Sequence, residues 1–272
     1  MPELPEVETI LCGIKKQILN IPILDVIIRQ YQLRWPIPKN IRTKLLNNIF
    51  LNVTRRGKYL LLNTQNGALI LHLGMSGRLQ ILPKDHEIGK HEHVTIIFAD
   101  GKSLCFIDPR RFGSLLWTSL DPKQHKLLKF LGPEPLSTNF TGKYLFSKSR
   151  NRKVAVKQFL MNSKVVVGVG NIYANEALFL AKIHPQKSSQ NLTLVESELL
   201  VKSIKIILKN AIKKGGTTIR DYITSDGKTG YFQNELQVYG RSGLPCINCV
   251  SLLQEIRMGG RSTVFCPKCQ SL

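Results

Sequence analysis

The sequence predicts an α+β fold: an antiparallel β-sandwich packed on an N-terminal helix, then a helical region, then a four-cysteine zinc-finger β-hairpin. Three observations lead to this prediction. Helical periodicity near the N-terminus gives way to the alternation typical of strands. A segment rich in proline and glycine at 131–139 ends the strands, and helical periodicity follows it. Two cysteine pairs lie near the C-terminus. We therefore expect domains at residues 1–133, 134–235 and 236–272.

The first helix is expected to begin at Pro5, because proline suits the first helical turn. Glu6 and Glu8 follow, where carboxylates interact favourably with the positive end of the helix dipole. Apolar residues then recur at helical spacing, at Val7, Ile10, Leu11, Ile14 and Ile18.

Strands are expected where the period becomes two. The eight segments are 23–30, 49–55, 59–63, 68–73, 78–82, 93–98, 104–107 and 114–117. Asn66-Gly67 and Asp100-Gly101 are dipeptides typical of hairpin turns. Eight short strands joined by polar turns favour an antiparallel sandwich or flattened barrel.

In the second half of the chain, helices are expected at 152–161 and 171–181. Thr193 and Glu196 have the spacing of a capping box, which opens a longer helix through Ile212. Residues 217–233 are polar and contain glycine, which is typical of a loop.

Gly168-Val-Gly170 resembles the start of a dinucleotide-binding fingerprint, but a third glycine and a surrounding strand–helix–strand unit are missing, so we expect no nucleotide cofactor. A glycine turn before a helix can also hold a phosphate with its backbone amides. The alternative is an ordinary turn between helices. Asn171 and the basic residues at 148–157 favour phosphate.

The charge balance favours a polyanionic partner. Lys and Arg number 39 against 18 Asp and Glu, which gives a net charge of +21. Such an excess is typical of nucleic-acid binding, although it also occurs in proteins that are simply lysine-rich. The sequence contains neither a long apolar run nor a signal-peptide pattern, so a cytoplasmic protein without membrane contact is expected.

The six cysteines divide into two kinds. Cys12 and Cys105 stand alone in apolar stretches, and we expect both to be buried. The other four form two C-x-x-C pairs separated by sixteen residues: Cys246, Cys249, Cys266 and Cys269. This spacing predicts a structural zinc site, which a reducing compartment favours over two disulfides. The insert would form a hairpin whose Gly259-Gly260 turn presents Arg261.

The first residues suggest chemistry. Removal of Met1 would expose the secondary amine of Pro2, whose pKa would lie near the α-amino value of roughly 8. Such an amine is nucleophilic, and it forms a charged iminium with an aldehyde-level carbon. Glu3 and Glu6 are close enough in sequence to act as acid or to hold the ammonium. The alternative is that these residues only begin a helix.

Together these motifs resemble the formamidopyrimidine-DNA glycosylase family of bacterial base-excision repair. The resemblance covers essentially the whole chain. It rests on Met-Pro-Glu-Leu-Pro-Glu-Val-Glu-Thr at 1–9, Arg-Gly-Lys-Tyr-Leu at 56–60, His-Leu-Gly-Met-Ser-Gly at 72–77, Asp-Pro-Arg-Arg-Phe-Gly at 108–113, Gly-Val-Gly-Asn-Ile-Tyr at 168–173, Gln-Val-Tyr-Gly-Arg at 237–241 and the four cysteines.

The resemblance implies a β-sandwich, a helix-two-turn-helix domain and a zinc finger, in a monomer that binds duplex DNA across the cleft between its halves. It implies a glycosylase and AP lyase acting on 8-oxoguanine and formamidopyrimidines, with β,δ-elimination through a Schiff base on Pro2. Glu3 would be the acid, Glu6 a supporting residue, Lys58 an aid to β-elimination and Arg261 to δ-elimination. DNA-binding residues would be His91, Arg110, Arg152 and Asn171, and the wedge that fills the gap left by the extruded base would be Met75, Arg110 and Phe112.

Two other functions remain open at this point. An enzyme resembling endonuclease VIII would share the fold and remove oxidised pyrimidines, although Leu4 and the Met75, Arg110 and Phe112 set favour purines. A zinc protein that only binds DNA would need neither Pro2 nor Glu3.

Overall fold

The computed structural model describes residues 2–217 and 232–272. The chain forms two compact units. Unit 1 comprises the residues up to Lys129 and a segment that begins at Gly215, whereas unit 2 comprises Phe130–Lys214 and Phe232–Leu272. The division of the chain into domains at 1–133, 134–235 and 236–272 stays a prediction.

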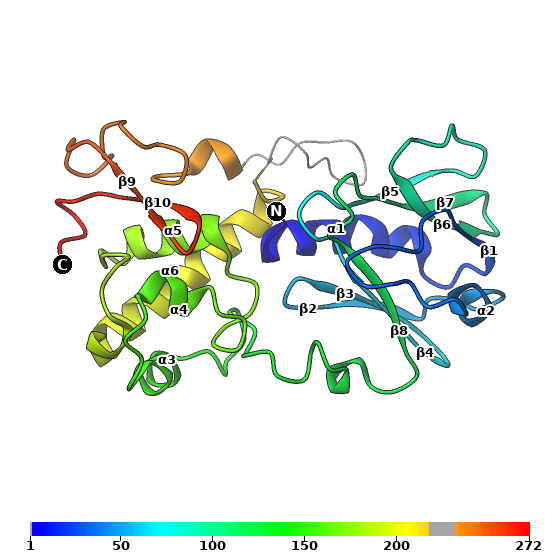
Figure 1. Cartoon of the computed structure of the whole chain (residues 1–272), viewed down its shortest axis with the longest axis horizontal. Coiled ribbons are helices and arrows are strands. Elements are labelled where there is room, and N and C mark those ends of the chain that lie inside the picture. The colour runs from blue at the N-terminus through cyan, green and yellow to red at the C-terminus, as the bar shows by residue number, and fades with distance from the viewer. Residues whose placement is uncertain (1, 218–231) are drawn as a thin grey trace. The chain divides into compact units, whose positions relative to one another are not determined.

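Unit 1 is a sandwich of two antiparallel four-stranded sheets (Figure 1). The first sheet has the order β1-β6-β7-β5 and the second has the order β2-β3-β4-β8. The strands are β1 Ile23–Ile28, β2 Asn52–Arg56, β3 Tyr59–Thr64, β4 Gly67–His72, β5 Arg78–Pro83, β6 Glu92–Phe98, β7 Lys102–Ile107 and β8 Ser114–Thr118. Each of the eight expected strands is confirmed, with ends that differ by up to three residues.

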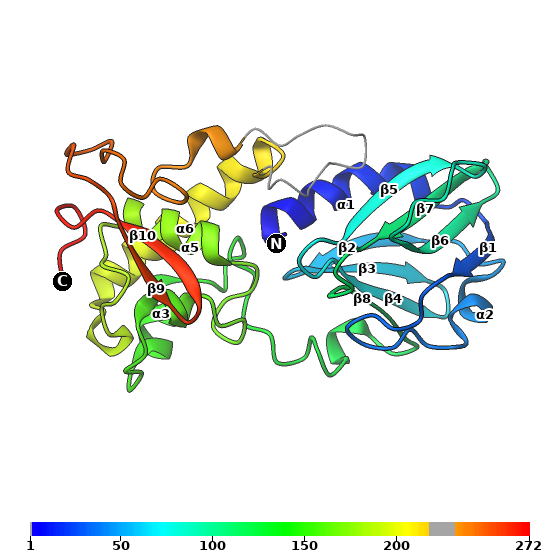
Figure 2. The same ribbon diagram turned by 45° about the horizontal axis from the view of Figure 1, so that its top comes forward.

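Helix α1, Leu4–Ile18, runs along the sandwich and contacts β5 of the first sheet and β2 of the second (Figure 2). Both are edge strands of their sheets, so α1 covers one open side of the sandwich. The apolar stripe expected from the sequence is buried along this helix, which confirms its helical period. The short helix α2, Ile41–Leu45, packs against β1 at the far edge of the first sheet.

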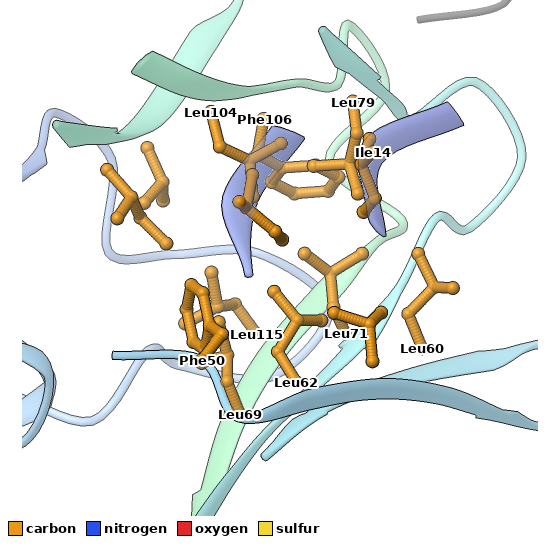
Figure 3. Close-up of a cluster of buried hydrophobic side chains, with 14 of the residues drawn as sticks. Ile14, Phe50, Leu60, Leu62, Leu69, Leu71, Leu79, Leu104, Phe106 and Leu115 are labelled. Atoms are coloured by element: carbon orange, nitrogen blue, oxygen red, sulfur yellow. The ribbon is translucent and has the colours of Figure 1, made fainter. Parts of the chain in front are cut away.

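The space between the sheets and α1 is filled by apolar side chains (Figure 3). Leu79 and Phe106 reach it from the first sheet, Leu62 and Leu71 from the second, and Ile14 from α1. All five are at most 1% exposed. Full burial of one such side chain stabilises a fold by about 1.5–3 kcal/mol, so the cluster is the main support of unit 1.

The two expected hairpin turns are present, one of them shifted. Gly101 adopts a φ of 82° in the β6–β7 turn, a conformation that glycine reaches at little cost. In the β3–β4 hairpin, Thr64 pairs with Gly67, so the turn residues are Gln65 and Asn66. The turn therefore lies one residue earlier than expected from Asn66-Gly67.

Unit 2 is helical and carries a β-hairpin. Its helices are α3 Gly142–Ser149, α4 Val156–Leu160, α5 Asn171–Leu180 and α6 Leu194–Lys213, and its strands are β9 Gln254–Met258 and β10 Arg261–Phe265. Helices α3 and α5 both pack against α6. The capping box of Thr193 and Glu196 opens α6 as expected. Single 3-10 turns lie at Pro122–Gln124 in unit 1, and at Ser189–Asn191 and Phe232–Glu235 in unit 2.

The helix expected at 152–161 is wrong in its first part, because α4 begins only at Val156. The preceding backbone is extended and pairs with a distant segment: Val156 N–H donates to the Lys187 carbonyl, and Ser189 N–H donates to the Val154 carbonyl. This pairing takes the hydrogen bonds that an earlier helical turn would have used. The sequence reading also missed α3, whose N-cap Thr141 accepts from Tyr144 N–H.

The expectation that Cys12 is buried is also wrong, because its side chain is exposed on α1. Cys12 follows Leu11 on the helix, and one further residue turns it away from the buried stripe. Cys105 is buried on β7, as expected. Across the described residues, no helix is long and apolar enough to cross a membrane.

The segment before the cysteines is anchored to α5 by the carboxylate of Glu176. Its oxygens accept from three consecutive backbone N–H groups: Gln237 at 2.9 Å, Val238 at 3.0 Å and Tyr239 at 2.8 Å. Glu176 is 2% exposed. These hydrogen bonds satisfy buried donors that would otherwise be costly.

Replacing Glu176 with glutamine should therefore destabilise unit 2. The glutamine NH2 group cannot accept, so one backbone N–H loses its partner, at a cost of about 1–3 kcal/mol in the free energy of unfolding. Glu255→Gln is the matched control, because Glu255 is exposed on β9 and should change stability by less than about 0.5 kcal/mol. Urea unfolding of both variants measures the difference, and equal stability would show that Glu176 is no anchor.

Candidate active site and nucleic-acid interface

The start of α1 places three of the expected residues together. Pro2 and Glu3 are buried, and Glu6 is completely buried one turn into the helix. The Glu6 carboxylate accepts from Glu3 N–H at 2.8 Å. Its other oxygen accepts from the backbone N–H of Thr217 at 2.9 Å and from the Thr217 hydroxyl at 3.0 Å. Glu6 thus fixes the backbone on which Pro2 and Glu3 stand.

Lys58 lies in the turn between β2 and β3, beside the same helix. Gly57 precedes it with a φ of 58°, which lets the two-residue turn close. The guanidinium of Arg55 donates to Glu8 of α1 at 2.7 Å and to the Gly57 carbonyl at 2.9 Å. One side chain therefore ties the Lys58 turn to the helix that carries Pro2 and Glu3.

His72, at the end of β4, lies close enough to Lys58 for their charges to interact. Burial, with the positive charges of Lys58 and Arg34, lowers the pKa of His72 to about 4. The imidazole is therefore neutral at neutral pH. Its Nδ1 accepts from Gly74 N–H at 2.9 Å, so the ring proton is on Nε2. A neutral His72 adds no further positive charge next to Lys58.

Two loops of unit 1 are held against each other by Asp108, which is completely buried. One carboxylate oxygen accepts from the Ser76 hydroxyl at 2.9 Å and the other from Gly113 N–H at 2.7 Å. Gly74 permits the close approach, because a Cβ there would lie 2.4 Å from the Phe112 backbone. The loop after β4 and the loop after β7 therefore form one surface.

This surface presents the three residues expected to act as a wedge. Met75 is 40% exposed and Phe112 is 43% exposed. Arg110 is exposed too, and its guanidinium lies 4.9 Å from the centre of the Phe112 ring. The carbonyl of His91 accepts from Asp108 N–H at 3.0 Å, which places His91 beside the same loop. Large apolar side chains left in water at a loop tip are typical of a binding surface.

In unit 2 the structure brings Asn171 and Arg261 together. Asn171 opens α5, and its Nδ2 donates to the Ser262 carbonyl at 3.1 Å. The buried Lys157 donates to the same carbonyl at 2.8 Å and to the Thr263 hydroxyl at 2.6 Å. Arg261 is exposed at the first position of β10, after a Gly259-Gly260 turn in which both φ angles are positive. The hairpin that carries Arg261 is therefore held by α4 and α5.

The remaining expected DNA contact, Arg152, is exposed in the segment between α3 and α4. Its backbone pairs with Ser149 and Gln190, so the side chain extends from a fixed position. Most of the loop expected at 217–233 lies outside the described residues.

The four cysteines of unit 2 lie close enough together to bind one metal ion. Their sulfur atoms all lie within 4.8 Å of one another. Cys246 and Cys269 are 3.9 Å apart, and Cys249 and Cys266 are 3.4 Å apart. A tetrahedral zinc with bonds of about 2.3 Å separates its sulfur ligands by about 3.8 Å. All four cysteines are free of disulfides, and they hold one structural zinc ion, as expected from the sequence.

The sequence reading missed the residues that position the site. Asp108, Glu176 and Lys157 are charged side chains that the fold buries completely or nearly so. One signal was available for Glu176, which interrupts an otherwise apolar segment with Asn175 beside it. Asn175 accepts from Val264 N–H at 2.9 Å, so both polar residues serve the attachment of the C-terminal segment.

Comparisons with known proteins agree with this arrangement. Three family models match the chain: "Formamidopyrimidine-DNA glycosylase N-terminal domain" at residues 1–115, "Formamidopyrimidine-DNA glycosylase H2TH domain" at 131–223, and "Zinc finger found in FPG and IleRS" at 243–272.

Relatives match over the full length. The formamidopyrimidine-DNA glycosylase of Nitrosococcus oceani is 51% identical over 99% of this chain and 100% of its own. The structure of a Lactococcus lactis FPG mutant with Fapy-dG-containing DNA has a TM-score of 0.93 and 38% identity, covering 100% of both chains. The structure of MutM in complex with carbocyclic 8-oxo-G-containing DNA has a TM-score of 0.92 and 38% identity, and the match again covers 100% of both chains. The chain belongs to the formamidopyrimidine-DNA glycosylase family.

Proposed function

We propose that this chain is a bifunctional DNA glycosylase and AP lyase that removes oxidised purines from duplex DNA in base-excision repair. The observation that carries the proposal is the fixed position of Pro2 and Glu3 on the buried Glu6 carboxylate, in the same unit as the exposed wedge surface. A protein that only binds DNA has no need for a buried carboxyl beside an N-terminal secondary amine.

The first step is attack by the Pro2 nitrogen on C1′ of the damaged nucleoside. The bond from C1′ to the base breaks, and the base leaves with its electron pair, which takes up a proton. Glu3 supplies a proton to the opening sugar ring. Proton donation by a positioned carboxyl typically accelerates such a step by about 10²–10⁴-fold. The product is an iminium that joins C1′ to Pro2.

The iminium then draws electrons from the sugar. Loss of a proton from C2′ expels the 3′ phosphate by β-elimination, and a second elimination expels the 5′ phosphate. Lys58 stands on the turn fixed to α1 by Arg55, where its charge can assist the first elimination. Arg261 is assigned to the second elimination, in which it would contact a phosphate. Water finally releases the sugar fragment and restores the amine.

The base must leave the stack before C1′ can be attacked, which costs a few kcal/mol. Met75 and Phe112 are exposed apolar side chains that can replace the lost stacking. Arg110 lies over Phe112, where its guanidinium can donate to the base left unpaired. His91, Arg152 and Asn171 are assigned to contacts with the DNA phosphates on either side of the extruded base. The net charge of +21 favours such a polyanionic partner.

Blocking the Pro2 amine should abolish the reaction. A variant with one residue added before Pro2 turns the amine into an amide without a basic lone pair. We expect this variant to bind an 8-oxoguanine:C duplex and to lose both strand cleavage and covalent trapping by borohydride, whereas the unextended chain shows both. Gel assays of nicking and trapping measure the outcome.

The competing nucleophile in this experiment is Lys58. Mass spectrometry of the trapped peptide distinguishes the two, and a sugar attached to Lys58 would contradict the mechanism. A duplex carrying thymine glycol serves as the substrate control: faster cleavage of it than of 8-oxoguanine would assign the chain to oxidised pyrimidines instead.

Removing the wedge should slow excision of a stacked base more than cleavage at an abasic site. We expect Phe112→Ala and Met75→Ala each to lower single-turnover cleavage at 8-oxoguanine by about 10–100-fold, which corresponds to about 1.4–2.8 kcal/mol. A pre-formed abasic site has already lost its stacking and should be affected less. Equal losses on both substrates would assign these residues a packing role only.

The zinc site should be needed for DNA binding and not for the folding of unit 1. All four cysteines serve as ligands, which leaves no open position for chemistry. Cys249→Ser should lose the metal, disorder the hairpin that carries Arg261, and weaken DNA binding. Cys12→Ser, at an exposed cysteine of α1, is the matched control. Zinc analysis and DNA titration of both variants provide the test, and tight lesion binding by metal-free Cys249→Ser would refute it.

A further inference from the structure

A second cluster of possible metal ligands lies on the first sheet of unit 1. It consists of His86, Glu92 and Cys105, whose ligand atoms all lie within 4.8 Å of one another. Glu92 begins β6, Cys105 lies on the neighbouring strand β7, and His86 lies in the connection from β5 to β6. The adjacency of β5, β6 and β7 is visible in Figure 2. The cluster lies outside every motif used in the proposed reaction.

Two of these side chains, His86 and Glu92, are oriented by a contact on their other side. His86 Nδ1 lies 2.8 Å from the Pro83 carbonyl, which can only accept, so Nδ1 carries a proton and Nε2 is the atom turned to the cluster. Glu92 Oε1 accepts from Arg29 at 3.1 Å and from the Thr95 hydroxyl. Its other oxygen, Oε2, faces His86. Metal-binding histidines and carboxylates are typically held in this way.

The distances are close to those that a small cation needs. Cys105 Sγ lies 3.5 Å from His86 Nε2. A tetrahedral zinc with bonds of about 2.3 Å to sulfur and 2.0 Å to nitrogen would separate these two atoms by about 3.5 Å. Glu92 Oε2 lies 2.8 Å from His86 Nε2, and the same geometry needs about 3.3 Å. His86 stands in a connection outside the strands, so a movement of its ring by a few tenths of an ångström can supply the difference.

The surroundings distinguish this cluster from an ordinary surface ion pair. Glu92 is 3% exposed and Cys105 is completely buried, whereas His86 reaches the surface with 9% of its side chain and so offers a way in. Burial, followed by the nearby Glu92 carboxylate, raises the pKa of Cys105 to about 12.

We propose that His86, Glu92 and Cys105 form a second metal site, separate from the four-cysteine site, which takes a borderline-soft divalent ion such as Zn²⁺. Sulfur and imidazole ligands select such ions over Ca²⁺ and Mg²⁺. A thiolate and a carboxylate balance the two charges of the ion, and Arg29 remains on the outer oxygen of Glu92. Three protein ligands leave one position for water. In the metal-free state the position of the ion is taken by the proton that His86 Nε2 shares with Glu92 Oε2.

Binding at this site would fasten the connection from β5 to β6 onto β7. The connection ends at His91, next to Glu92, and His91 contacts the backbone of Asp108. The proposal does not depend on the enzymatic reaction, and it can be tested without DNA.

The test compares zinc content in the full-length protein after equilibration with excess Zn²⁺ and removal of loosely bound metal. The unaltered chain should retain about two zinc ions, and His86→Gln and Cys105→Ala about one each, held by the four cysteines. Cys12→Ala is the matched control and should retain about two. Added Zn²⁺ should raise the Tm of the unaltered chain and of Cys12→Ala, and leave that of His86→Gln unchanged.

Co²⁺ added to protein that carries about one zinc ion, at the four-cysteine site, provides a direct view of the sulfur ligand at the second site. A thiolate-to-cobalt charge-transfer band should appear in the unaltered chain and be absent in Cys105→Ala. His86→Gln alters a residue outside the strands, so its result holds even where Cys105→Ala folds poorly. If the unaltered chain retains only about one zinc ion, or if His86→Gln retains about two, the cluster is a hydrogen-bonded ion pair and the proposal is wrong.

Discussion

The arrangement of unit 1 depends on one buried carboxylate. Glu6 joins the backbone of Glu3, at the first turn of α1, to Thr217, more than two hundred residues later in the chain. Gly216 makes this approach possible, because its φ is 80° and a Cβ there would lie 2.9 Å from Glu6 Oε1. A completely buried carboxylate whose two oxygens accept from Glu3 and Thr217 has little freedom to move. The terminus that carries Pro2 and Glu3 is thus joined to the segment around Thr217 in the same unit.

Several of the other proposed site residues follow the same principle. A buried or partly buried polar side chain fixes the backbone that carries them. Asp108 holds the two loops of the wedge surface, Arg55 holds the Lys58 turn, and Lys157 holds the hairpin of Arg261. Rigid support beneath an exposed side chain keeps its geometry while leaving it accessible to a large substrate. The energetic cost of burying these charges is offset by hydrogen bonds on nearly every polar atom.

The sequence predicted the elements whose pattern is local. Alternating apolar residues predicted the strands, and the capping pair Thr193 and Glu196 predicted the start of α6. The predicted start of the helix at 152–161 was wrong, because the conformation there is set by pairing with a distant segment: Val156 N–H donates to the Lys187 carbonyl. Prediction also failed for Cys12, whose apolar neighbours suggested burial although the helix turns it outward.

Site residues could be named from motifs, but the groups that support them could not. Nothing in the sequence around Asp108 says which donors its carboxylate will meet, since the Ser76 hydroxyl and the Gly113 N–H come from separate loops. Glu176 similarly acquires its partners only when 237–239 folds against α5. Such contacts depend on the tertiary fold, whereas motif residues are recognised one position at a time.

The attachment of the β9–β10 hairpin bears on how its sequence can change over evolutionary time. Both Asn171 and Lys157 bind the carbonyl oxygen of Ser262, a backbone atom that every amino acid carries. The amino acid at position 262 can therefore change without moving Arg261. Gly259 and Gly260 are more constrained, because both adopt positive φ angles that residues with a Cβ rarely adopt. Variation in this hairpin should therefore be tolerated at position 262 while the turn stays constant.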